Sequence, residues 1–343
     1  MSAATTFRFD FHGVSIHVES DDAALIGLLR GRFRRFPPPG ASAPMLRFVL
    51  QRAKAGMKRM EIPAAARPVY DLTDGTVLYD DASGRIYLRH GRSVDMSVDP
   101  ASGTAHGWLI QHPEAAWIAS RPLFTIALLE LLKRRGLFGL HAALLARGSD
   151  GILVAGSSGA GKSTLALCLL RAGYRFGGDD MCFLDPAVNA VCARALPDEI
   201  DVAESTMKFF PELANGSGHT RPPGARKWLL TPEDVYPVDF VQRCTPRLLL
   251  LPQIGEHAIT VAEPVLPADA LLDIVPNVLL TDARASQAHL DVLAMLTTQG
   301  RCWRLRTGRD FDRIPRVVAE LLQQSMPVAR SHGHTPAAVP ARH

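Results

Sequence analysis

One glycine-rich run constrains the fold of this chain more than any other feature: Gly156-Ser157-Ser158-Gly159-Ala160-Gly161-Lys162-Ser163. It fits the pattern G-x-x-x-x-G-K-[ST], in which glycines let the backbone curl and aim successive N–H groups at a phosphate. An apolar stretch typical of a buried strand precedes it at residues 152–155, and a helical pattern follows at residues 164–171. A strand, a loop and a helix in this order predict an α/β fold with a phosphate-binding loop.

The chemistry of such a loop assigns roles to its residues. The loop N–H groups, with Thr164 at the start of the helix, are expected to surround the phosphates of ATP. Lys162 is expected to reach the β- and γ-phosphates, and the hydroxyl of Ser163 to be a ligand of Mg²⁺. The alternative is a surface loop that is rich in Gly and Ser by chance.

Two adjacent carboxylates follow the predicted helix. Asp179-Asp180 stand where the apolar stretch 181–184 begins, which places them at the start of a strand beside the loop. One carboxylate can take the proton from an attacking hydroxyl while the other helps to hold Mg²⁺, and phosphoryl transfer needs both. A polar turn after a helix is the alternative interpretation.

Residues 141–180 resemble the catalytic core of the HPr kinase/phosphorylase family. His141 begins a strand ahead of the loop, the helix ends in Gly173-Tyr174-Arg175, and Asp179-Asp180 closes the segment. The resemblance implies a phosphoenolpyruvate carboxykinase-like P-loop core, so that the chain is α/β in this part and α+β as a whole. It also implies that Asp179 transfers the proton and that Asp180 is a metal ligand. His141 then sits beside the phosphates, as a catalytic residue together with Lys162.

Beyond this segment the chain departs from the bifunctional members of the family. Their signature of the type Leu-Glu-x-Arg-Gly-x-Gly is missing, and Leu196-Pro197-Asp198-Glu199-Ile200-Asp201-Val202 stands in its place. Glu199 is a candidate for a third magnesium carboxylate, and the alternative is a capped turn before a helix at residues 203–213. The departure does not favour phosphorylase activity or HPr as the substrate. The chain looks more like the stand-alone HPr-kinase-related proteins that serve as accessory kinases.

The pattern along the chain predicts two domains and a tail. Residues 1–120 alternate like strands, with a hairpin at residues 7–18, a helix from about residue 20 to 36 and an antiparallel meander at residues 45–98. This smaller α+β region is a possible module for a substrate or partner. Residues 121–325 form the predicted ATP-binding catalytic domain, which opens with a buried helix, and residues 326–343 form a flexible tail.

Composition excludes several classes of function. With 38 Lys and Arg against 34 Asp and Glu, the net charge of +4 is too small to call for nucleic acid or an anionic membrane as a partner. No apolar run reaches the length of about 20 residues that spans a bilayer, and no signal peptide begins the chain. The five cysteines form no C-x-x-C pair and are expected to be reduced thiols. The predicted location is the cytoplasm.

Three further basic residues are candidates for the phosphate site. Lys227 follows a Pro- and Gly-rich stretch that includes Gly224-Ala225-Arg226, and such a loop can close on a triphosphate. Arg306 and Arg309 flank a predicted strand end and could face the nucleotide. The alternatives are a surface loop for Lys227 and a structural Arg–Asp pair for the two arginines.

The sequence therefore predicts a Mg²⁺- and ATP-dependent kinase that phosphorylates a Ser or Thr hydroxyl of a protein or peptide. A kinase acting on a small metabolite, built on the same core, is the first alternative. The second is a non-catalytic ATP-binding module that acts through a partner. The carboxykinase reaction is disfavoured, because no further cluster of metal-binding His and Lys stands out in the sequence. The related enzymes are hexamers, which makes a homo-oligomer a possibility.

Overall fold

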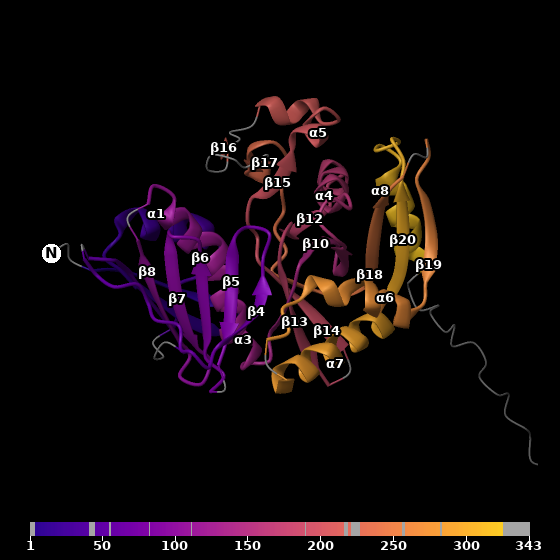
Figure 1. The fold of residues 1–343 in the computed structure, drawn as a ribbon. Helices are drawn as coiled ribbons and strands as arrows, with labels where there is room; N and C mark the ends of the chain where they lie inside the picture. The colour runs from indigo at the N-terminus through magenta and orange to yellow at the C-terminus, as the bar shows by residue number, and fades with distance from the viewer. Residues whose placement is uncertain are drawn as a thin grey trace, which may run out of the picture.

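The computed structural model describes residues 4–40, 45–54, 56–81, 83–110, 112–188, 190–215, 219–220, 227–255, 258–281 and 283–324. Within these residues the chain is a mixed α/β structure with three sheets (Figure 1). The predicted tail at 326–343 and the Gly224-Ala225-Arg226 segment lie outside the described residues.

The first half of the chain is an eight-stranded sheet with the strand order β1-β2-β3-β8-β7-β6-β5-β4. Its strands are β1 (Thr5–Phe11), β2 (Val14–Ser20), β3 (Leu46–Arg52), β4 (Arg67–Asp71), β5 (Thr76–Asp80), β6 (Ile86–His90), β7 (Val94–Asp99) and β8 (Thr104–Leu109). The predicted hairpin is confirmed, because Phe11 pairs with Val14 across an antiparallel turn. His12 and Gly13 both have positive φ angles, 53° and 90°, as a two-residue hairpin turn requires.

The predicted meander is confirmed for β4 to β7, which are antiparallel in sequence order, and β8, beyond the predicted range, continues it. Strand β3 differs, because it is parallel to both of its neighbours, β2 and β8. The first helix, α1 (Ala23–Arg32), is shorter than expected. Its N-cap is Asp22, whose side chain accepts a hydrogen bond from the N–H of Leu25 at 2.9 Å.

One helical segment covers the first sheet. It consists of α2 (Ala115–Ile118), a π-turn (Ala119–Leu123) that contains Pro122, and α3 (Phe124–Lys133). Contrary to the expectation that no apolar run is long enough to span a bilayer, this segment is able to cross a membrane by length and composition, but 78% of its apolar window is buried inside the protein. The ring of Phe124, for example, stacks on Phe48 of the sheet at 4.3 Å. The predicted domain boundary at residue 120 lies inside this segment, whose buried side chains belong to the core of the first sheet.

The second half is built on a nine-stranded sheet. Its strands are β9 (Phe138–Leu140), β10 (Ala142–Arg147), β11 (Asp150–Ala155), β12 (Arg175–Gly178), β13 (Cys182–Ala187), β14 (Ala190–Ala195), β18 (Arg243–Ile254), β19 (Val261–Val265) and β20 (Arg301–Thr307). Their order is β12-β10-β11-β18-β14-β13-β9, and β20 pairs with β18 and with β19. The strand predicted before the glycine-rich loop is β11, and the helix predicted after it is α4 (Lys162–Arg171).

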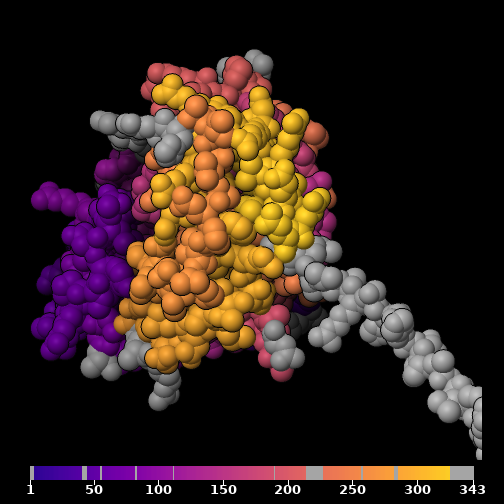
Figure 2. All heavy atoms as spheres, turned by 90° about the vertical axis from the view of Figure 1, so that its right-hand side faces the viewer, coloured from indigo at the N-terminus to yellow at the C-terminus, as the bar shows by residue number. Residues whose placement is uncertain are grey.

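Helices cover both faces of this sheet. Ile152 and Val154 of β11 face α4 and α8 (Ile314–Gln324), whereas Leu153 and Ala155 face α6 (Pro267–Ile274) and α7 (Ala283–Gln299). The alternation follows from the two-residue period of a strand. Figure 2 looks onto the outer side of this half, where the orange and yellow elements of the C-terminal part lie together. All five cysteines are free thiols, as expected, and four of them are buried.

A small third sheet lies above the place where the two larger sheets meet in the view of Figure 1. It contains β15 (Ile200–Ala203), β16 (His219–Thr220) and β17 (Lys227–Leu230), in the order β15-β17-β16. The helix predicted at residues 203–213 is wrong in extent. Only α5 (Glu204–Met207) is α-helical there, followed by a 3₁₀ turn (Pro211–Asn215), because a proline cannot continue an α-helix from its interior.

Buried and partly buried contacts join the two halves. The His12 Nε2 lies 2.7 Å from the carbonyl oxygen of Ala195, and the rings of Phe11 and Phe183 meet edge to face at 5.1 Å. At the other end of the boundary, the N–H of Leu280 donates to the Tyr70 hydroxyl at 2.8 Å. The first half is therefore packed against the second at several places.

Candidate active site

The glycine-rich loop links the end of β11 to the start of α4. Gly156, Gly159 and Gly161 have φ angles of 151°, 82° and 102°, which L side chains rarely adopt. Gly161 is the N-cap of α4, and no side chain caps the first turn of this helix among the residues described. The N–H groups of that turn are therefore available to an anion, where the helix dipole also favours negative charge.

The side chain of Lys162 is folded into its own loop. Its Nζ donates to the carbonyl oxygens of Gly156 at 2.8 Å and Ser157 at 3.3 Å, and the residue is buried. Burial lowers the pKa of this ammonium, and the nearby carboxylates Asp180 and Asp179 oppose that effect. A phosphate would offer Lys162 oxygen acceptors of full negative charge in place of two carbonyls.

Asp179 reaches the loop from the end of β12, the strand next to β10. Its side chain is buried, and its Oδ2 accepts a hydrogen bond from the hydroxyl of Ser163 at 2.8 Å. The other oxygen, Oδ1, is buried and accepts no hydrogen bond of good geometry from the described residues. The backbone N–H of Asp201 lies close enough to this carboxyl to lower its pKa slightly. Burial raises the pKa of Asp179 to about 7, and the charge of Asp180 acts in the same direction, whereas the Ser163 hydroxyl opposes it.

The residue before Asp179 must be glycine. Gly178 has a φ of 145°, and a Cβ there would lie 2.5 Å from the carbonyl oxygen of Leu196. This close passage of two backbones fixes the direction in which the chain leaves β12. It thereby sets the position of the two carboxylates that follow.

The side chain of Asp180 is exposed to solvent, unlike that of Asp179. Its side chain is 59% exposed, and its Oδ1 lies 3.5 Å from the Nε2 of His141. His141 occupies the break between β9 and β10, and its backbone N–H donates to the carbonyl oxygen of Asn277 at 2.9 Å. Burial lowers the pKa of His141, with Asp180 opposing the effect. The structure thus brings together the predicted residues Asp179, Asp180, Lys162, Ser163 and His141.

Glu199 lies in a cluster of charges at the boundary between the halves. The guanidinium of Arg121 donates to Glu199 Oε2 at 2.6 Å and to Asp198 Oδ1 at 3.2 Å. Arg32 donates from its Nε to Asp198 Oδ2 at 2.7 Å. Burial raises the pKa of Glu199, whereas the two arginines hold the pKa of Asp198 far below its usual range. The predicted third metal carboxylate is therefore in an ion pair with the first half of the chain.

The side chains fit a magnesium ion that is held mainly by phosphates. No group of three or more His, Cys, Asp or Glu able to hold a metal occurs among the residues described. Mg²⁺ does not need one, since it usually takes one or two carboxylates, substrate phosphates and several waters. Asp180 has an exposed carboxylate beside the loop, and the Ser163 hydroxyl lies 2.8 Å from the carboxylate of Asp179. Glu199 would have to leave Arg121 before it could join them.

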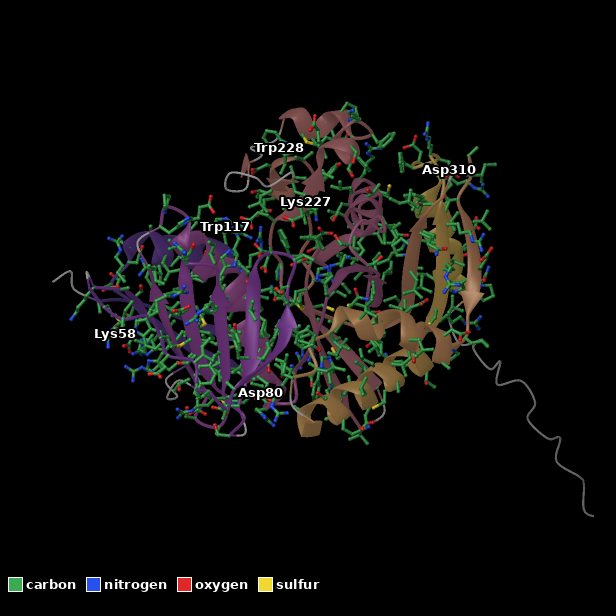
Figure 3. The ribbon with its side chains drawn as sticks, in the orientation of Figure 1. Lys58, Asp80, Trp117, Lys227, Trp228 and Asp310 are labelled. Carbon is green, nitrogen blue, oxygen red and sulfur yellow. The ribbon has the colours of Figure 1, made fainter. Side chains whose placement is uncertain are left out.

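A cleft of about 1410 Å³ runs from the loop to the first half of the chain. Loop residues 156–160, His141, Asp180, Glu199 and Lys227 line it. Lys227 lies 3.8 Å from Asp201, measured from Nζ to Oδ2, and its charge helps to lower the pKa values of Lys162 and His141. Figure 3 shows Lys227 and Trp117 on facing sides of the opening between the halves.

Other predicted residues lie away from this cleft. Arg306 pairs with Glu263 of β19 at 3.1 Å, and neither Arg306 nor Arg309 is among the residues that line the cleft. The hydroxyl of Thr164 lies 3.3 Å from that of Thr206 in α5.

Sequence reasoning missed several residues that line the cleft. Arg304 was missed, and it pairs with Asp273 at 2.7 Å. Ile254 and Leu272 were also missed, although they are 70% and 71% exposed. No local signal separates such side chains from core residues, because an isolated Ile or Leu in a strand or helix pattern is normally packed.

Comparisons with known proteins give a distant likeness. No protein-family model and no curated protein matches the sequence. Among solved structures, the chain is similar to an HPr(Ser) kinase/phosphatase from Coxiella burnetii, with 13% identity and a TM-score of 0.27. The match covers 54% of this chain and 94% of that one.

Proposed function

We propose that this chain is a Mg²⁺- and ATP-dependent kinase that transfers the γ-phosphate to a Ser or Thr hydroxyl of a protein or peptide in the cytoplasm. The hydroxyl oxygen bonds to the γ-phosphorus, and the bond from that phosphorus to the bridging oxygen of ADP breaks. The hydroxyl proton passes to Oδ1 of Asp179. The observation that carries the proposal is the buried, half-satisfied carboxylate of Asp179 beside the glycine-rich loop.

A purely structural aspartate does not account for this carboxylate. A buried acceptor without a partner costs free energy, and such groups are rare in folded proteins. Ser163 satisfies Oδ2, so Oδ1 is the atom left to accept a proton. Asp179 is buried and does not line the cleft, so the proposed step requires the glycine-rich loop to move and expose Oδ1 when ATP and the acceptor bind. A pKa of about 7 suits a general base that works near neutral pH, because the base must be ionised and still hold a proton well.

The other predicted residues have complementary tasks in the proposed reaction. The loop amides and Lys162 would position the triphosphate, and Lys227 would add positive charge at the opening. Ser163 and Asp180 would hold Mg²⁺, which neutralises charge on the β- and γ-phosphates when it is bound. His141, neutral at the depressed pKa, would orient the Asp180 carboxylate by hydrogen bonding.

Transfer is expected to rise with pH through an apparent pKa near 7, because Asp179 accepts a proton only when it is ionised. Below that value kcat/KM should fall about tenfold per pH unit. The contribution of Asp179 to the stability of the fold changes with pH in the direction opposite to that of the transfer rate. Between the ordinary Asp pKa of about 3.9 and the folded value, only the folded protein binds this proton, so the free energy of unfolding falls as pH rises. A kcat/KM profile without an ionisation in this window contradicts the assignment.

Intact mass spectrometry distinguishes the acceptor classes. The full chain is incubated with Mg²⁺ and ATP and with the small proteins and peptides encoded next to its gene, and in parallel with hydroxyl-bearing metabolites. A phosphoryl group gained on a Ser or Thr of a polypeptide supports the proposal. Gain on a metabolite alone supports a metabolite kinase. Tight ATP binding with no gain anywhere supports a binding module, and either of the last two results overturns the proposal.

A further inference from the structure

The cleft extends well beyond the space that a nucleotide needs. Its volume of about 1410 Å³ exceeds the roughly 300–1,000 Å³ typical of a pocket for one small ligand. The far wall comes entirely from the first half of the chain. Six of the residues in this wall are Leu72, Asp74, Glu114, Trp117, Ile126 and Leu129.

Part of this far wall is an apolar floor, formed by Trp117, Ile126 and Leu129, that leads to the proposed reaction centre. Trp117, Ile126 and Leu129 belong to the helical segment that covers the first sheet. The side chain of Leu129 packs so closely on Gly139 that a Cβ there would lie 1.9 Å from Leu129 Cδ2. Gly139 is two residues before His141, so the apolar floor ends next to the imidazole that faces Asp180.

The uncompensated charge on this wall is negative. Among the residues described, Asp74 and Glu114 have no basic side chain as a partner, and Asp74 accepts only the N–H of Thr76 at 2.9 Å. The arginines that line the cleft are all neutralised, Arg32 and Arg121 by the pair Asp198 and Glu199, and Arg304 by Asp273. Two other basic side chains line it: Lys227 lies 3.8 Å from Asp201 on the opposite side, and the ring of His90 is hydrogen-bonded to the Thr76 hydroxyl at 2.9 Å. The wall therefore favours a cation and disfavours a second anion next to ATP.

We propose that this wall binds the phosphate acceptor, and that the acceptor carries an ammonium or guanidinium group on an apolar body. In a peptide this is a Lys or Arg close to the Ser or Thr. The inference rests on the proposed function and adds the substrate class to it. Asp74 and Glu114 would attract the cation, and the indole of Trp117, which also lines the cleft, would add a cation–π attraction where its face meets the ligand. The apolar floor would hold the neighbouring side chains.

Binding of matched peptides tests this wall. Three Ser-containing peptides of the same sequence carry Arg, Gln or Glu near the Ser, and calorimetry measures their affinity for the full chain. The Arg peptide is expected to bind about tenfold more tightly than the Glu peptide. Changing Asp74→Asn and Glu114→Gln together should reduce this ratio to near one without a change in ATP affinity. The matched control, Asp312→Asn with Glu320→Gln, removes two carboxylates near and on α8, outside the cleft, and should keep the ratio.

The outcomes separate this inference from the proposed function. Peptide affinity is measured without ATP, so a chain that transfers no phosphate still reports the charge preference. Equal affinity for the three peptides, tighter binding of the Glu peptide, no binding of any peptide at millimolar concentration, or an unchanged preference in the Asp74/Glu114 variant overturns the inference. None of these results bears on whether phosphate moves from ATP to a hydroxyl, which the mass measurement decides.

Discussion

Replacing Asp179 by Asn is expected to reduce phosphoryl transfer by about 10²–10⁴-fold, the usual contribution of a general base. The amide has nearly the same shape and still accepts a hydrogen bond from Ser163 through its oxygen, so the loop should keep its geometry. Affinity for ATP should therefore stay the same. Single-turnover transfer and equilibrium ATP binding, measured on the same preparation, separate the two quantities.

Asp180 is the matched comparison, because it is the adjacent carboxylate and lines the cleft itself. With the proposed roles, Asp180→Asn weakens Mg²⁺ binding, and a higher Mg²⁺ concentration should recover its transfer rate. The same increase should leave Asp179→Asn inactive. If Mg²⁺ rescues Asp179→Asn and not Asp180→Asn, the two carboxylates have exchanged roles. Equal loss of ATP affinity and transfer in Asp179→Asn would make that residue structural.

Replacing Arg32 by Ala is expected to lower the free energy of unfolding by about 3 kcal/mol, because it leaves the buried carboxylate of Asp198 with one partner fewer. Arg121 keeps its contact with Asp198, which places the effect at the lower end of the range of about 3–5 kcal/mol for broken buried pairs. Urea unfolding near neutral pH measures the change. Below the ordinary Asp pKa of about 3.9 the difference should narrow, because the unfolded chain then binds a proton at Asp198 that the folded protein, with its depressed pKa, takes up only at still lower pH.

Arg85→Ala is the matched control for Arg32→Ala. Arg85 pairs with Asp99 at 3.1 Å on the surface, and its loss should cost less than about 1 kcal/mol. The double variant Arg32→Ala with Asp198→Ala should be less destabilised than the sum of the single variants, because no buried charge is then left alone. An Arg32→Ala effect as small as that of Arg85→Ala would show that the boundary cluster is not an important part of the fold's stability.

Local patterns explain the parts of the fold that the sequence predicted well. The hairpin turn needs positive φ at His12 and Gly13, and the alternating residues on either side give the two strands. The glycine-rich loop is similar, because three of its residues adopt φ angles that only glycine takes easily. The closeness of Ser163 and Asp179 follows from β12 lying two strands from β11, which the order along the chain alone does not give.

Long-range packing decides what the sequence left open. The partner of Glu199 is Arg121, 78 residues earlier, and nothing in either neighbourhood specifies the other. The apolar pattern of Leu123 to Leu132 predicts a buried helix but not the sheet that buries it, and the structure places this helix on the first sheet. The far wall of the cleft could not be predicted from the sequence for the same reason. Asp74 and Trp117 line the same cleft only because of how the first half folds.

The chemical fate of the γ-phosphate is the most direct test of the central claim. Phosphorus NMR follows the full chain with Mg²⁺, ATP and a peptide that carries Ser and Arg. The proposed function predicts that ADP and a phosphate monoester on the peptide appear together and in equal amounts. ATP that stays intact, or ADP formed only together with inorganic phosphate, would contradict the claim that this chain transfers phosphate to a hydroxyl.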